Sequence, residues 1–105
     1  MNTPPTASTE HVLSHAEEAS GMLKLIAHPH RLMILCLLSE RERNVSELVE
    51  AIGINQTAVS NHLAKLRSEG VVEFTRYHRV LQYRIVSPEI MTLISTLCHL
   101  YRAND

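Results

Sequence analysis

The 105-residue sequence has few of the features that mark membrane, secreted or catalytic proteins. It has no run of 18 apolar residues, so no transmembrane helix is expected. The opening residues, MNTPPTASTEH, have neither the basic start nor the apolar run of a secretory signal, and we expect a cytoplasmic protein. The motifs GxSxG, HExxH and the P-loop do not occur, and no cofactor motif is visible, which disfavours an enzyme.

Cysteine and aromatic residues are also scarce. The two cysteines, Cys36 and Cys98, do not form a CxxC pair, which excludes a zinc ribbon, and in the cytoplasm both are expected to be thiols at rest. With one phenylalanine, three tyrosines and no tryptophan, aliphatic side chains must fill most of the interior. The length favours a single domain, and a chain this small is helped by a partner subunit.

The formal net charge of −1 hides an uneven distribution. Residues 56–84 carry five Lys or Arg against two Glu, whereas residues 1–55 carry four against seven acidic residues. A local basic stripe matters more for phosphate binding than the total charge. The middle of the chain is therefore the candidate for contact with nucleic acid.

Apolar spacing of three and four residues predicts helices over residues 10–27 and 29–39, separated at Pro29. The second of these is apolar nearly all round, which is typical of a buried central helix. We expect residues 1–9 to form a flexible tail and residues 10–105 to form one domain.

The next segments form a pattern typical of a helix-turn-helix. Asn44 and Glu47 have the spacing of a capping box, and Gly53 fits the end of the helix that they begin. A further helix is expected from Gln56 to Gly70, after a short turn. Alternating residues then predict a β-hairpin of strands 71–76 and 80–86, and a last helix that Ser87 and Pro88 begin. The fold class is mainly α with a β-hairpin, in the order α-α-α-α-β-β-α, a winged helix-turn-helix.

In such a fold the second helix of the pair enters the major groove of DNA, with its N-terminal residues toward the base edges. Amide and hydroxyl side chains suit base contacts, and cations suit phosphates. The expected base contacts are Gln56, Thr57, Ser60 and Asn61, with His62 on base or phosphate, Lys65 and Arg67 on phosphate, and Arg76, His78 and Arg79 at the tip of the wing.

Three stretches resemble the ArsR/SmtB family of bacterial repressors: AHPHRLMIL, NQTAVSNHLAKLRSEGVV and YRIVSPEI. The resemblance covers about Leu23 to Tyr101. It implies a homodimer with the first and last helices packed across a two-fold axis, and an operator whose half-sites lie one helical turn apart. It also implies a repressor that releases DNA when a metal binds or when thiols are modified.

The metal branches of the family are poorly matched. Their zinc site uses Asp-x-His at the start of the last helix, where this sequence has Ser87-Pro88-Glu89, and the arsenic-type Cys-x-Cys pair is absent. His11 and His15, four residues apart, form the candidate metal pair, although such a surface pair more often holds nothing. We expect structural roles for His28 and His30.

The thiols leave more than one interpretation open. RLMILCLL resembles the persulfide- and redox-sensing branch at Cys36, but that branch has its second cysteine where this sequence has Arg102, and Cys98 lies four residues earlier. That offset is one helical turn, about 5–6 Å along the axis. A direct disulfide needs Cα atoms within about 7 Å, so the offset acts against direct pairing of Cys36 with Cys98. A bridge with extra sulfur atoms spans more. Buried cysteines that act as small hydrophobic residues are the alternative.

The main hypothesis is a dimeric repressor released from a two-fold operator by modification of Cys36 and Cys98. The alternatives are a metal-responsive or ligand-independent repressor of the same fold, and a winged-helix adaptor that binds proteins.

Overall fold

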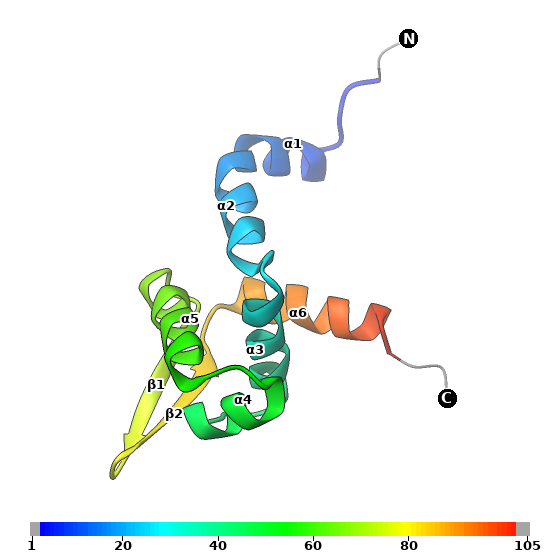
Figure 1. The fold of residues 1–105 in the computed structure, drawn as a ribbon. Helices are drawn as coiled ribbons and strands as arrows, with labels where there is room; N and C mark the ends of the chain where they lie inside the picture. Colours follow the sequence, from blue (N-terminus) through cyan, green and yellow to red (C-terminus); the bar gives the residue numbers. More distant parts are fainter. Residues whose placement is uncertain (1–2, 103–105) are drawn as a thin grey trace.

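The computed structural model describes residues 3–102, and within that range it contains six helices and one two-stranded sheet (Figure 1). In chain order the elements are α1 (Ala7–Ser14), α2 (Ala16–Ile26), α3 (Pro29–Glu40), α4 (Val45–Ile52), α5 (Gln56–Ser68), β1 (Val72–Tyr77), β2 (Val80–Ile85) and α6 (Pro88–Leu100). This is the predicted winged helix-turn-helix with one additional helix at the N-terminus.

The prediction of one helix over residues 10–27 was wrong, because the helix is interrupted at His15, between α1 and α2. A continuous helix would bond the His15 N–H to the His11 carbonyl. The Ser14 hydroxyl (2.9 Å) and the His15 Nδ1 (2.9 Å) bond to that carbonyl instead, and the His15 N–H donates to Val12. Helix α1 also begins at Ala7, inside the predicted tail, of which residues 1–2 lie outside the described range.

Helix α3 is the centre of the fold, as its apolar sequence predicts. Pro29 occupies its first turn, where a missing N–H costs nothing. Ile34, Leu35 and Leu38 are buried, and α2, α4, α5, α6 and β2 all pack around the helix. Helix α5 packs on α4 and β1 as well as on α3, and these elements together set its position.

The helix-turn-helix pair is fixed by local hydrogen bonds. Asn44 Oδ1 accepts from the Glu47 N–H at 2.9 Å, and Glu47 Oε1 accepts from the Asn44 N–H at 3.0 Å, which confirms the capping box. The hydrogen bond from the Asn44 N–H lowers the pKa of Glu47 below its usual value, and a second hydrogen bond, from Arg41, contributes less. Gly53 ends α4 with φ of 83°, and Asn55 caps α5 through the Ala58 N–H at 2.8 Å.

The wing is an antiparallel hairpin whose register runs from Val72 opposite Ile85 to Tyr77 opposite Val80. Its two-residue turn includes His78 with φ of 59°, a conformation in which His is enriched among residues other than glycine. Backbone hydrogen bonds of 2.9 and 3.2 Å also join Tyr83 of β2 to Arg43 in the α3–α4 link. The wing is thereby held beside the helix-turn-helix pair.

The chain is extended rather than spherical. Its Cα radius of gyration is 16.3 Å, compared with about 13 Å for a compact chain of this length. Helices α1 and α2 project on one side and α6 on another (Figure 1). The projecting parts expose large apolar side chains, namely Val12, Leu13, Leu23 and Leu100.

Within residues 3–102 no single helix is both long and apolar enough to cross a membrane. Helices α2 and α3 meet the length and hydropathy criteria only together, and they are bent by 91° where they join.

Candidate DNA-binding surface and thiol pair

Helix α5 has one buried face and one open face. Val59, Leu63 and Leu66 are fully buried against the core. Six of the predicted DNA contacts lie exposed on the rest of the helix: Gln56, Thr57, Ser60, Asn61, Lys65 and Arg67. The apolar face fixes the rotation of the helix, so the hydrogen-bonding face is presented to solvent in one orientation.

His62 does not share that open face. Its side chain is half-buried at the edge of the core, with its ring centroid 4.6 Å from that of His28 at the start of α3. Burial, together with the nearby His28 and Arg31, lowers the pKa of His62 below its ordinary value. The structure therefore places this predicted DNA contact against α3.

Two predicted phosphate contacts already have partners. Lys65 Nζ lies 3.6 Å from Glu69 Oε1, and Arg67 Nε lies 2.6 Å from Glu73 Oε1. The Arg67 guanidinium also covers the Phe74 ring at 4.4 Å, and its hydrogen bond lowers the pKa of Glu73. Each carboxylate therefore competes with a phosphate for its cation.

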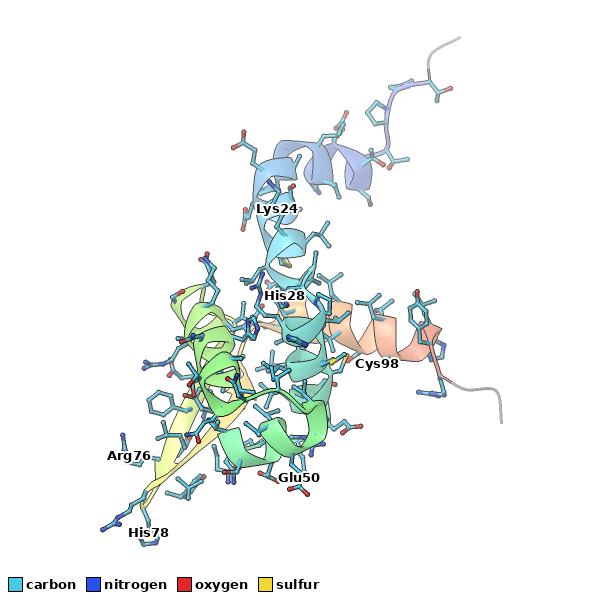
Figure 2. All side chains as sticks on the ribbon, viewed as in Figure 1. Lys24, His28, Glu50, Arg76, His78 and Cys98 are labelled. Carbon is cyan, nitrogen blue, oxygen red and sulfur yellow. The ribbon has the colours of Figure 1, made fainter. Side chains whose placement is uncertain are left out.

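The wing extends the surface beyond α5. Arg76, His78 and Arg79 are exposed at the tip of the hairpin, far from the core, where Figure 2 labels Arg76 and His78. A groove of about 370 Å³ joins the two parts, lined by Gln56 and Ser60 of α5, Ser46 of α4, and Arg79. Helix and wing therefore border one concave surface.

The two thiols lie in contact on the opposite side of α3. Cys98 Sγ of α6 donates a hydrogen bond to Cys36 Sγ of α3, with the sulfur atoms 3.7 Å apart. A disulfide bond is about 2.0 Å long, so the atoms are about 1.7 Å from bonding distance. The one-turn offset of Cys98 thus does not separate the sulfurs. Both cysteines are free thiols in the structure.

The thiols differ in exposure and acidity. Cys98 is exposed near the projecting end of α6 (Figure 2), whereas Cys36 is half-buried beside an apolar hollow lined by Leu32, Met33 and Ile52. Burial, helped by the hydrogen bond from Cys98, raises the pKa of Cys36 to about 11. At neutral pH Cys36 is therefore a protonated thiol.

Comparisons with known proteins identify the family. The model of the bacterial regulatory proteins of the arsR family matches residues 28–73, which run from the start of α3 into β1. A biofilm growth-associated repressor of Xylella fastidiosa is 38% identical over 96 residues, covering 91% of this chain and 84% of the repressor. The chain belongs to the arsR family.

Solved structures agree with this assignment. The transcriptional repressor BigR from Xylella fastidiosa matches with a TM-score of 0.79 and 35% identity, over 89% of this chain and 92% of that one. Reduced HlyU from Vibrio cholerae matches with a TM-score of 0.83 and 33% identity, over 90% and 99%. The arsR-family chain is thus a DNA-binding transcriptional regulator with a winged helix-turn-helix fold, and the family is not one of enzymes.

The structure shows the local surroundings of the histidines that the sequence singled out in this arsR-family regulator. His15 Nδ1 is hydrogen-bonded to the His11 carbonyl and the Ser14 hydroxyl, so that nitrogen faces the backbone and not the His11 ring. His28 has the expected structural role, because its Nδ1 caps α3 by accepting from the His30 N–H at 3.1 Å. Sequence reasoning missed that His28, His30 and His62 meet. The sequence signal that could have indicated this contact is the position of His62 next to the buried face of its helix.

Proposed function

We propose that this regulator is a homodimeric repressor that leaves its operator when Cys36 and Cys98 become covalently joined. The observation that carries this proposal is the 3.7 Å separation of the two sulfur atoms, one on α3 and the other on α6. The family comparison supports repression through relatives whose names describe repressors. The regulator acts in the cytoplasm, where both thiols are reduced at rest.

DNA is contacted by α5 and the wing. Gln56, Thr57, Ser60 and Asn61 lie exposed at the N-terminal end of α5, as major-groove contacts require. Lys65, Arg67, Arg76 and Arg79 bind phosphates and set the register, with His78 at the tip of the wing beside them.

The dimer forms through the N-terminal helices and α6. Three observations support this arrangement: the extended shape, the exposed apolar side chains at both projecting ends, and a largely apolar groove between α2 and α6 lined by Ala19, Met22, Leu23 and Leu93. A second copy that covers these surfaces presents two α5 helices to a two-fold operator.

The bridge forms in two steps. A sulfane-sulfur donor such as inorganic polysulfide meets the exposed Cys98 first, whose thiolate takes a sulfur atom and releases the shortened polysulfide. Cys36 then loses its proton to water, and the resulting thiolate attacks Cys98 Sγ, expelling hydrosulfide and leaving a disulfide. If Cys98 carries two extra sulfurs, attack on the first of them expels hydrosulfide and leaves a trisulfide. In each case the donor accepts the two electrons that the thiols lose.

The bridge reaches the DNA-binding surface through α3. This helix packs against α6 on one side and against α4 and α5 on another. A covalent link between α3 and α6 changes the angle at which the dimer helices meet the core, and so the spacing of the two α5 helices. A coupling of about 1–3 kcal/mol corresponds to a change of roughly 5–150-fold in operator affinity.

The test is operator binding measured by fluorescence anisotropy, with an operator selected from genomic fragments. Reduced protein, polysulfide-treated protein, and treated Cys36→Ser and Cys98→Ser variants are compared, with the mass of each sample recorded. Treatment should weaken binding at least about fivefold in the wild type and leave both variants unchanged. The proposal is contradicted if the treated wild type carries the bridge by mass and all four samples nevertheless bind the operator with equal affinity.

A further inference from the structure

Three histidines from two segments meet on the side of α3 that faces α5. His28 and His30 flank Pro29 at the start of α3, and His62 comes from the middle of α5. All three side chains are half-buried, and one ring nitrogen from each lies within 4.8 Å of the others. Figure 2 labels His28 at the junction of α2 and α3. The cluster includes His62, which the sequence analysis expected to contact base or phosphate.

The cluster is close to the dimensions of a metal site. The ring centroids are 4.6 Å apart for His28 and His62, 5.6 Å for His28 and His30, and 6.0 Å for His30 and His62. Zinc-to-histidine bonds of about 2.0–2.1 Å in a tetrahedral site place ligand nitrogens about 3.3 Å apart. The nitrogens, now within 4.8 Å of one another, must come closer by up to about 1.5 Å to hold a zinc ion, and the proposed site requires rotation of the three half-buried side chains to bring this about.

Two local features disfavour a cation in this cluster and lower the affinity of the site for a metal ion. His28 Nδ1 accepts from the His30 N–H, so a metal at that nitrogen replaces the cap, and a metal at Nε2 requires the ring proton to move to Nδ1. Arg31 is the nearby positive charge, although its Nε is held by the Leu25 carbonyl at 2.6 Å.

We propose that His28, His30 and His62 bind one divalent late first-row metal ion of the Zn²⁺ class, in a three-histidine site with one position open. Imidazole is the ligand type that zinc, copper and nickel accept, and three protein ligands leave a coordination position for water. The bound ion joins the first turn of α3 to the middle of α5. It therefore fixes the DNA-reading helix to the core independently of the thiol pair.

The experiment uses full-length Cys36→Ser/Cys98→Ser protein, so that no thiolate competes for the metal. Co²⁺ is titrated while its visible ligand-field absorption is recorded, followed by competition with Zn²⁺ and by thermal unfolding with and without Zn²⁺. One Co²⁺ per chain is expected, with an absorption intensity typical of a low-coordinate site. Zn²⁺ should displace it and raise Tm by several degrees.

Two variants remove ligands while keeping the fold. His28→Asn retains an N-cap acceptor for α3, and His30→Gln leaves the cap untouched, since the cap uses only the backbone of residue 30. Each should weaken Co²⁺ binding at least about tenfold. His78→Gln at the wing tip is the matched control and should bind as the parent does.

The opposite pattern overturns the site. The site is contradicted if both ligand variants bind Co²⁺ with unchanged affinity. It is also contradicted if the double substitution His11→Gln/His15→Gln abolishes Co²⁺ binding. Failure of the metal titration leaves the thiol proposal intact, because that proposal is tested by DNA affinity in the wild-type chain.

Discussion

The ion pairs on α5 lead to a quantitative prediction about salt. Each protomer presents four cations to the proposed duplex, Lys65, Arg67, Arg76 and Arg79, and the first two are paired with Glu69 and Glu73. Within residues 3–102 no carboxylate lies within ion-pair distance of the other two. The slope of log K against log salt concentration is about −0.9 for each phosphate neutralised. A dimer with only the wing arginines bound gives a slope of about −3.6, and one with all eight cations bound gives about −7.2.

Substitution of Glu73 by Gln distinguishes these cases. The amide keeps the size of the side chain and an acceptor for the Phe74 N–H, but it removes the charge that holds Arg67 at 2.6 Å. If Arg67 is held back in the wild type, the variant releases one cation per protomer. The slope then becomes steeper by about 1.8, and affinity at low salt rises.

The assay is fluorescence anisotropy of a labelled operator at five or more salt concentrations. Glu10→Gln on α1 removes the same charge far from the proposed DNA-binding surface and is expected to leave the slope unchanged. Adding Arg67→Gln to Glu73→Gln should restore the wild-type slope. A variant slope equal to that of the wild type, with equal affinity at low salt, refutes the idea that Glu73 competes with phosphate for Arg67.

Three further predictions concern the fold and the thiols. Leu63→Ala, at a fully buried position, should lower the free energy of unfolding by about 2–5 kcal/mol in urea at fixed protein concentration, and a loss below 1 kcal/mol contradicts the packing described. Gly53→Ala should cost about 1–2 kcal/mol because φ is 83°, and Gly53→Asn should cost less; equal losses would show that backbone strain is not the cause. With Cys98 held as a mixed disulfide with thionitrobenzoate, release of that group by Cys36 should accelerate steadily between about pH 7 and 9, because burial, the largest cause, still raises the pKa of Cys36 and the thiolate fraction rises with pH. A rate independent of pH excludes Cys36 as the attacking thiol.

The elements that the sequence predicted well are those set by local chemistry. Pro29 in the first turn of α3, the Asn44–Glu47 capping box and Gly53 at the end of α4 each depend on residues a few positions apart. Their outcomes do not depend on the rest of the fold. Apart from His62, the residues predicted to contact DNA on α5 are exposed for a related reason, since the apolar positions of that helix fix which face is open.

The features that the sequence did not predict depend on competing or distant contacts. The break at His15 follows from the Ser14 and His15 side chains taking the His11 carbonyl, against a spacing that suits a longer helix. The meeting of His62 with His28 depends on how α5 packs on α3, which no local pattern encodes. The contact of Cys36 with Cys98 depends in the same way on the packing of α6 against α3.

The most direct test of the thiol mechanism measures bridging and DNA release in one sample. Wild-type protein is treated with increasing polysulfide, and each aliquot is divided between intact-mass analysis and operator anisotropy, before and after a reductant is added. The loss of operator affinity should grow with the fraction of chains that carry an intramolecular bridge, and the reductant should remove the bridge and restore the affinity. Fully bridged protein that binds the operator as tightly as reduced protein would contradict the account.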